Sequence, residues 1–338
     1  MFRNRVTKTI RLATLLLFLL LFPTLLFSQA PQRVRVGLPT FSIPFVALPV
    51  GQAKGFFREE GLEVELIRMR TPVAMIALTN KEIDYAVATG SLLVSAVKGL
   101  PLKIVMYWLR APLHVLNAKP EIRSIQELGG KTIGIAGVTE TTGVLLQAIL
   151  ASVKMDREKD VKILLIPDSG NRFATLSQGL MEGAILPPPF NLQAEAKGFR
   201  RLKAAAELPE IIDGTFPLPP PTGLGLNVEK LQSNPRQVKQ MIRAILKSQA
   251  FIRQNKAETI KIMSSWLKID GSTASGSYDL YVDAMSLDGL VGAGVVESAV
   301  EETRQESKIK EKVPAAKVAD FSLVMEALAE LGVTRSSR

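Results

Sequence analysis

The feature that most constrains the fold is a repeated order of elements at a spacing of 97 to 99 residues. A shift of 98 residues superposes apolar positions of one helix and strand on those of another: Met75 on Phe173, Leu78 on Leu176, Ile83 on Met181, Ala86 on Ala184 and Val87 on Ile185. Shifts of 97 and 99 align flanking strands, with Val36-Gly37 on Ile133-Gly134 and Leu62, Val64 and Leu66 on Val161, Ile163 and Leu165. Single matches arise by chance, but the same order at one spacing predicts two similar lobes.

Within each half, short apolar runs typical of strands alternate with longer runs of helical period. The predicted strands of the first half are 33–39, 62–67, 83–88 and 102–109, and its helices are 43–61, 71–80 and 91–100. The second half repeats this with strands near 131–136, 161–166 and 182–186 and helices at 141–153 and 171–180. Such alternation predicts an α/β fold in which each sheet is mainly parallel and flanked by helices.

The second half ends in a proline-rich stretch, 216–223, which suits a stiff crossover between lobes. We expect the chain after it to be helical, with helices beginning after Asn234 and spanning Lys256–Leu267, Thr273–Met285 and Phe321–Leu331. These late helices are expected to pack on the first lobe. Lobe 1 is therefore predicted at 34–116 plus 223–338, and lobe 2 at 117–222.

The N-terminus is typical of an export signal. Four basic residues precede an apolar run, 12–27, which is shorter than the roughly 20 residues of a membrane span. Ser28-Gln29-Ala30 then resembles a cleavage site, so we predict a signal peptide over 1–30 and a periplasmic protein. Because Pro31 is a poor residue after a cut, an uncleaved membrane anchor is the alternative.

Charge and cysteine content narrow the class of protein. Of 42 basic and 32 acidic residues, four basic ones lie in the signal, which leaves an excess of six. The basic residues are interleaved with acids and lack stacking aromatics, so no nucleic-acid partner is expected. The chain has no cysteine, which excludes disulfides, thiolate metal sites, a cysteine nucleophile and a lipidated cysteine.

Four strand ends are candidate ligand contacts, because ligands of open parallel sheets bind beyond the carboxyl ends of strands. They are Pro39–Ser42, Thr89–Ser91, Gly137–Thr142 and Pro187–Phe190, two in each predicted lobe. We predict that a ligand lies between the lobes and faces all four ends. The predicted contacts are Thr40, Phe41, Ser42, Thr89, Gly90, Ser91, Arg110, Thr139, Thr141, Thr142, Pro188 and Phe190.

Several of these residues have a structural alternative. The hydroxyls of Ser91 and of Thr139 to Thr142 stand at helix starts, where they commonly cap the helix. A binding role would add an anion held by free N–H groups at the positive helix end. Phe41 and Phe190 are either cleft walls or core. Asp84 and Glu182, at the start of apolar strands, fit a capping or hinge role better than ligand contact.

Enzymatic motifs are lacking in the sequence. His114 is the only histidine and is expected to end a strand without a catalytic role. There is no Gly-x-Ser-x-Gly stretch, and Gly-Gly-Lys-Thr at 129–132 lacks the glycine that a phosphate loop carries upstream. We therefore predict a binding protein rather than an enzyme, with no cofactor and no metal.

Four motifs resemble a known family: GQAKGFFREEGLEVEL, LTNKEIDYAVATGS, IRSIQELGGKTIGIAG and LSQGLMEGAILPPP. The sequence is similar over 34–331 to substrate-binding proteins of ABC importers in the nitrate, sulfonate and taurine group. That group shares the NMT1/THI5-like fold of thiamine-pyrimidine precursor proteins. Two features depart from its pattern: Glu182-Gly183-Ala184 stands where the family has Asp-Ala-Ala, and three prolines, 187–189, follow.

The resemblance implies a two-lobed periplasmic binding protein fold of type II, with the cleft between the lobes. The implied function is capture of a small molecule and its delivery to ABC permease subunits by a monomer. The ligand is left open between a sulfonate, a nitrate-like or carboxylate anion, and a heterocycle. A periplasmic enzyme on the same fold and a sensor that docks on a receptor are the alternatives.

Overall fold

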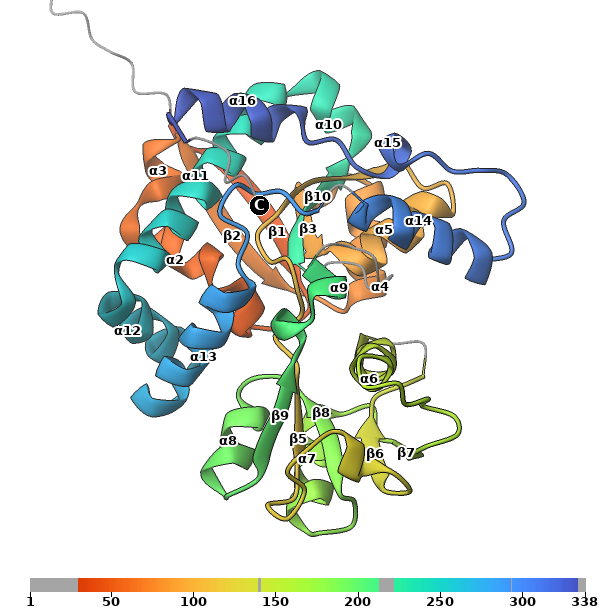
Figure 1. The fold of residues 1–338 in the computed structure, drawn as a ribbon. Helices are drawn as coiled ribbons and strands as arrows, with labels where there is room; N and C mark the ends of the chain where they lie inside the picture. The colour runs from red at the N-terminus through yellow and green to blue at the C-terminus, as the bar shows by residue number, and fades with distance from the viewer. Residues whose placement is uncertain (1–29, 139–140, 213–221, 293, 334–338) are drawn as a thin grey trace, which may run out of the picture. The chain divides into compact units, whose positions relative to one another are not determined.

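The computed structural model describes residues 30–138, 141–212, 222–292 and 294–333. The described residues from Gln32 onward form one compact unit. This unit contains two five-stranded sheets, each flanked by helices (Figure 1). The predicted α/β fold of the periplasmic binding protein type is thereby confirmed.

The first sheet combines strands from both ends of the chain. In spatial order they are β2 (Leu62–Arg68), β1 (Gln32–Leu38), β3 (Tyr85–Ala88), β10 (Thr222–Asn227) and β4 (Leu102–Tyr107). β1 runs parallel to β2 and β3, whereas β10 is antiparallel to β3 and β4. The parallel strands end at one edge of the sheet, where the first half of the predicted contacts lies.

The second sheet repeats this arrangement. Its order is β7 (Lys162–Leu165), β6 (Thr132–Ile135), β8 (Gly183–Leu186), β5 (Val115–Ala118) and β9 (Arg200–Ala204). β6 is parallel to β7 and β8, and β5 is antiparallel to β8 and β9. The register preserves the spacing in sequence, because Val36 pairs with Leu66 in the first sheet and Ile133 with Ile163 in the second. The repetition is thus present in strand order. The register relates β2 to β7 by 97 residues rather than by the 99 of the sequence alignment, because Leu66 corresponds to Ile163 and not to Leu165.

One carboxylate in each sheet occupies the same place in this repeat. Asp84 and Glu182 each precede the central parallel strand, accept a backbone N–H from the neighbouring strand and pair with a lysine. The donors are Arg35 N (2.7 Å) and Lys230 Nζ (2.7 Å) for Asp84, and Thr132 N (3.0 Å) and Lys119 Nζ (3.2 Å) for Glu182. The Thr132 N–H lowers the pKa of Glu182. Both residues therefore join strands.

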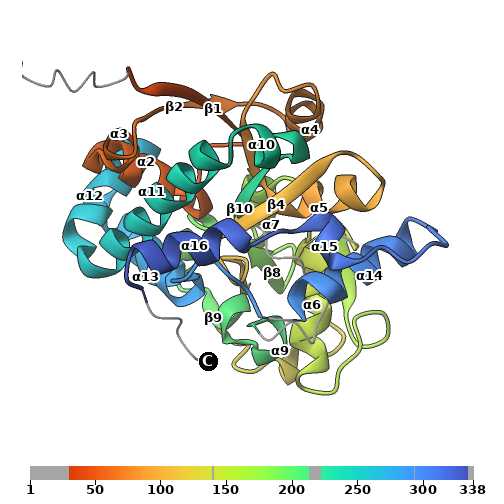
Figure 2. The ribbon, with the colours of Figure 1, turned by 90° about the horizontal axis from the view of Figure 1, so that it is seen from above.

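Helices cover both faces of the first sheet (Figures 1 and 2). One group comprises α2 (Ala47–Lys54), α3 (Phe56–Glu59), α11 (Pro235–Gln254), α12 (Lys256–Leu267), α13 (Gly271–Ala284) and α16 (Ser322–Glu330). The other comprises α4 (Thr71–Thr79), α5 (Thr89–Val97), α14 (Val295–Glu306) and α15 (Ala315–Val318). The short helix α10 (Val228–Ser233) follows β10. The two groups bury separate apolar clusters on the two faces.

The second sheet is covered by fewer helices. α7 (Ser169–Ser177) and α8 (Phe190–Ala196) pack on each other and on β8, around Leu176, Met181 and Ala194. α6 (Thr141–Ala151) buries Leu145, Leu146 and Ile149 in a different cluster. Helices therefore shield both faces of this sheet as well.

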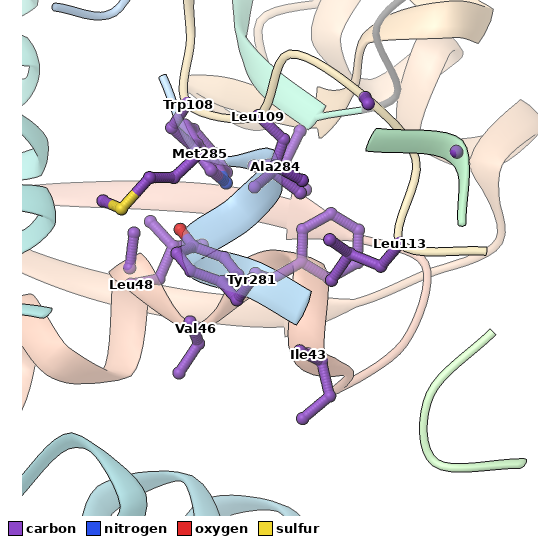
Figure 3. Close-up of a cluster of buried hydrophobic side chains, with 14 of the residues drawn as sticks. Ile43, Val46, Leu48, Trp108, Leu109, Leu113, Tyr281, Ala284 and Met285 are labelled. Carbon is purple, nitrogen blue, oxygen red and sulfur yellow. The ribbon is translucent and has the colours of Figure 1, made fainter. Parts of the chain in front are cut away.

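An apolar cluster surrounds the point where the chain leaves β4 (Figure 3). Trp108 is buried there, and its Nε1 donates to the carbonyl of Pro44 in the short helix η1 (Ile43–Phe45). The carbonyl of Trp108 accepts from Gln249, whose Oε1 accepts from the hydroxyl of Tyr281. These bonds fix the start of the first passage between the sheets to three helices.

The structure corrects three expectations of secondary structure. The helix predicted over 43–61 is broken at Gly55, whose φ of 78° lies in the left-handed region and ends α2. The chain after the proline-rich stretch does not become helical at once, because β10 begins at Thr222. The sequence analysis also missed β9 and the helices α8 and α14.

Most of the proline-rich crossover, 213–221, lies outside the described residues. The remaining late helices agree with the prediction: Asn234 accepts the N–H of Gln237 and caps α11, and α12 spans Lys256–Leu267. The lobe boundaries at 116/117 and 222/223 stay a prediction.

Candidate functional site

A cavity of about 940 Å³ is lined by elements of both sheets. The first sheet's side supplies residues of α4, α5 and α14. The second sheet's side supplies residues of α6 and α7, together with Ala136 after β6, Pro167 before α7 and His114 before β5. Its polar lining consists of Thr71, Ser91, Ser95, His114, Thr141, Thr142, Ser169, Arg172, Glu302, Thr303 and Glu306. The cavity is therefore rich in hydroxyls and carries charges of both signs.

Four of the predicted contacts line this cavity: Gly90, Ser91, Thr141 and Thr142. They come from two of the four predicted strand ends, one in each sheet. Thr139, which belongs to the same stretch as Thr141, lies outside the described residues. The cavity lining thus joins two predicted half-sites, which stay candidates for ligand contact.

The hydroxyls at these helix starts differ in what they bind. No side chain caps the start of α5, so Ser91 does not act as its cap. Thr142 is buried, and its Oγ1 accepts the N–H of Ala136 at 2.8 Å, which ties α6 to the end of β6. Ser91 and Thr141, both partly exposed at the cavity wall, are the better candidates for ligand contact.

The contacts predicted after β1 are not part of the described cavity lining. Thr40 is exposed, and Phe41, 44% exposed, packs edge-on against Trp266 with ring centroids 5.4 Å apart. Ser42 precedes η1 without a capping hydrogen bond. Thr89 is buried in the first turn of α5.

The other predicted contacts also lie elsewhere. Arg110 donates to the backbone carbonyl of Asp283 at the end of α13. Pro188 is buried and forms a cis peptide bond with Pro189. Phe190 begins α8 and packs on Phe173 in α7, with ring centroids 5.9 Å apart. Its role in the described structure is core packing.

Arg172 is a cavity residue that sequence reasoning missed. It is 1% exposed, and its guanidinium donates to the carbonyls of Ile185 (2.9 Å), Ile166 (2.6 Å) and Pro167 (3.2 Å) and to Ser169 Oγ (3.2 Å). Its aliphatic stem passes over Gly134, where a Cβ would lie 3.2 Å from the Arg172 Cγ. The guanidinium thus joins the ends of β7 and β8 and places a positive charge at the cavity wall.

His114 also lines the cavity, directly before β5. Its Nδ1 is enclosed, and within the described part of the chain it has no hydrogen-bond partner. Burial, followed by the charge of Arg172, lowers the pKa of the imidazole from 6.5 to about 4. The ring is therefore neutral at neutral pH, with one donor and one acceptor nitrogen. The sequence placed His114 at a strand end but gave no signal of a cavity.

No cluster of three or more His, Asp or Glu side chains that could hold a metal ion occurs among the described residues. Of the helices within the described ranges, none combines the length and apolar character needed to span a membrane.

Two similar α/β sheets, with a cavity lined from both, define the architecture of a periplasmic binding protein. The family model described as NMT1/THI5-like matches residues 43–259, more than half of the chain. The chain therefore belongs to the NMT1/THI5-like family.

A relative by sequence is a Haemophilus influenzae protein named for a suggested part in thiamine biosynthesis. It is 31% identical over 163 residues, which cover 47% of this chain and 49% of the relative. The chain thus matches about half the length of this curated relative.

Solved structures of similar fold include two proteins titled as binding proteins. The sulfonate-binding protein SsuA of Methylobacillus flagellatus has a TM-score of 0.71 and 17% identity, covering 91% of this chain and 98% of that one. The nitrate-binding protein NrtA of Synechocystis has a TM-score of 0.64 and 15% identity, covering 90% of each chain. The desulfurization enzyme DSZB has a TM-score of 0.64 and 11% identity, covering 89% and 99%. At these identities the likeness concerns the fold.

Proposed function

We propose that the protein is an extracytoplasmic solute-binding protein that captures a small molecule in this cavity and delivers it to an ABC permease. The observation that carries the proposal is a single cavity lined from both sheets, with the starts of α5 and α6 in its wall. Family membership and the binding proteins among the structural neighbours support the same function. The volume of about 940 Å³ lies within the range of small-molecule sites.

Capture would work by closure of two lobes, 34–116 plus 223–338 and 117–222. A ligand that touches residues of both lobes gains its full contacts only when the lobes are close together. Its binding free energy therefore shifts the population from open to closed. The permease would recognise the closed form, and one copy of the protein suffices for this mechanism.

A periplasmic enzyme on the same fold is the second candidate, because the fold of DSZB shows that an enzyme can be built on it. The cavity holds a neutral histidine, His114, which could act as a base. Turnover of a bound compound by the purified protein would favour this reading over transport. A third candidate is a sensor, and docking of the closed, ligand-bound form on a receptor would favour it.

The first test is native mass spectrometry of protein purified from its periplasm without refolding. We expect a retained small molecule that is released on denaturation, because closed binding proteins hold ligand through purification. Absence of any retained compound, together with no thermal stabilisation by sulfonates, nitrate, carboxylates or amino-heterocycles, would contradict a solute-binding function.

We predict export with removal of residues 1–30. Cell fractionation should place the protein in the periplasm, and its N-terminal sequence should begin at or just after Pro31. Recovery of an N-terminus within residues 1–10 from the membrane fraction would establish the uncleaved anchor instead.

Replacement of Ser91 or Thr141 by alanine is expected to weaken binding of the retained solute by about 1–2 kcal/mol, the scale of a lost hydrogen-bond partner. Because no side chain caps α5, Ser91→Ala should leave the melting temperature of the ligand-free protein unchanged. Calorimetric titration and thermal melting of the same variants separate the two effects.

The control for this pair is Ser272→Ala, an exposed serine in the first turn of α13 and outside the cavity lining. It should change neither affinity nor stability. A loss of stability in Ser91→Ala or Thr141→Ala at unchanged affinity would place that residue outside the site.

A further inference from the structure

The helix α14 forms one wall of the cavity through Glu302, Thr303 and Glu306. It packs against α5, which carries Gly90 and Ser91 into the same cavity. The cavity therefore brings a pair of carboxylates to the same space as the candidate hydroxyl contacts. We refer to Glu302 and Glu306 as the acidic wall.

A third acid of α14, Glu301, is paired within the helix. Glu301 accepts two hydrogen bonds from Arg304, at 2.8 and 2.6 Å, and one from Gln305. Neither Glu302 nor Glu306 has an ion-pair partner among the described residues. Like charges four residues apart destabilise a helix by a few tenths of a kcal/mol, so this pair does not serve stability.

The environment of Glu302 supports the same reading. Burial, followed by the charge of Glu306, raises the pKa of Glu302 from 4.5 to about 7. The ionised form of such a carboxylate is stabilised when a positive or N–H-donating group binds to it, because its charge is then compensated. The acidic wall itself, Glu302 and Glu306, supplies no positive group of this kind.

The described residues of the other cavity walls contribute one cation, Arg172, against the two carboxylates of the acidic wall. Among the described lining residues Arg172 is the single cation, and four hydrogen bonds direct its guanidinium to Ile166, Pro167, Ser169 and Ile185. His114 is neutral, and its enclosed Nδ1 finds no partner within the described residues, so the imidazole adds no positive charge to the cavity. The hydroxyls of Ser91 and Thr141 are neutral groups that can donate or accept.

We infer that the solute carries a basic nitrogen, as an ammonium, an amidinium or an amino-substituted heterocycle, which donates to Glu302 and Glu306. This inference rests on the proposed binding function and names its substrate class. It sets this cavity apart from the anions for which the sulfonate- and nitrate-binding proteins of similar fold are named. A free oxyanion beside the acidic wall would meet like charge, which disfavours its binding.

The test uses three planar probes of nearly the same size: benzamidine, a cation; benzamide, which is neutral; and benzoate, an anion. Titration calorimetry at pH 8 should show benzamidine bound at least about tenfold more tightly than benzoate, or about 1.4 kcal/mol. Glu302→Gln should abolish this preference for the cation while affinity for benzamide changes less than about twofold.

The stability of the ligand-free variant distinguishes a binding role from a structural one. Because ionised Glu302 is costly in its partly buried position, Glu302→Gln should raise the melting temperature at pH 8 by roughly 2 °C. A residue retained for stability would lower it. Glu297→Gln, an exposed acid on the same helix and outside the cavity lining, is the matched control and should change neither quantity.

Tighter binding of benzoate than of benzamidine, or an equal preference in the wild type and Glu302→Gln, would overturn the inference and leave the solute-binding function standing. A retained natural ligand without nitrogen would do the same. Failure of all three probes, together with failure of every solute in the wider thermal panel, would count against the binding function itself.

Discussion

Replacement of Arg172 by methionine is expected to lower the free energy of unfolding by about 3–5 kcal/mol. The guanidinium is buried and donates to the carbonyls that end β7 and β8, including Ile166 and Ile185. Methionine fills much of the same volume but donates nothing, so these buried acceptors lose their partner. The ends of β7 and β8 lose a side-chain connection as a result.

The positions of the two tryptophans allow the loss of stability to be assigned to the second sheet. Trp108 and Trp266 both belong to the structure around the first sheet, whereas Arg172 lies in the second. In denaturant, circular dichroism reports both sheets and tryptophan fluorescence reports the first. For Arg172→Met we expect the dichroism midpoint to fall more than the fluorescence midpoint, so that the transitions no longer coincide.

Two further variants complete the Arg172 experiment. Arg172→Lys keeps the charge but can reach fewer carbonyls, so its loss of stability should be intermediate. Arg200→Met removes an exposed arginine of the same sheet that makes one 3.4 Å hydrogen bond to Pro120, and it should change stability by less than about 0.5 kcal/mol. A loss below about 1 kcal/mol in Arg172→Met would show that its hydrogen bonds do not hold the sheet edge.

The repeat could be predicted because both halves use the same strand pattern for the same reason. Central strands such as β1 and β6 are covered by helices on both faces. Their sequences are therefore short, mainly apolar runs that can be recognised without the structure. Gly37 and Gly134 occupy equivalent positions, where a Cβ would press on Ile83 and Met181 at 2.7 and 2.5 Å. Sequence spacing alone therefore recovers which strands correspond.

The strand β10 could not be recognised from residue preference. Its sequence, TGLGLN, is rich in glycine, which weakens a strand signal. The glycines are needed because their neighbours approach closely: a Cβ on Gly223 would lie 2.1 Å from the Met106 carbonyl oxygen, and one on Gly225 would lie 2.1 Å from Leu92. Close tertiary packing, rather than strand propensity, determines this segment.

The helix α14 left a readable pattern that the sequence analysis did not use. Val295, Val296, Ala299, Val300 and Thr303 form its buried face at helical spacing. Recognition of this face would have placed Glu302 beside a buried stripe rather than on a solvated surface. The acidic wall was thus within reach of the sequence as a local feature, but its cavity was not.

The candidate site likewise contains some residues that could be predicted from the sequence and others that could not. Ser91 and Thr141 were predictable because they follow strand ends, where the fold directs ligands. Arg172 and His114 were not, because their positions depend on contacts between segments distant in sequence. His114 owes its low pKa to burial by both sheets' elements and to the charge of Arg172, neither of which a local motif records.

The neutral state of His114 predicts an acid-dependent loss of stability. The pKa of this imidazole is about 4 in the folded protein and 6.5 when unfolded, so the unfolded chain binds more protons between these values. The contribution of His114 to stability is therefore present above pH 6.5 and is lost as the pH falls toward 4. We expect a loss of about 2 kcal/mol by pH 5, since one pKa unit corresponds to about 1.4 kcal/mol.

The chain has one histidine, which makes the measurement direct. The imidazole Cε1 proton signal in NMR spectra of the folded protein should not shift between pH 8 and pH 5.5. Titration of this signal near pH 6.5 would show that the ring is solvated and would remove the basis for the stability loss.

Glu302 opposes His114 over part of the same pH range, so variants are needed to separate them. The pKa of Glu302 is raised to about 7, and the folded protein therefore gains stability from its protonation as the pH falls from 7 to 4.5. In His114→Gln only this gain remains at the cavity, and the variant should lose less stability than the wild type between pH 7.5 and pH 5. In Glu302→Gln the histidine acts alone, and the acid loss should be steeper than in the wild type. Because exposed carboxylates titrate alike in all three proteins, differences between their pH profiles isolate the cavity, and parallel profiles would contradict both assignments.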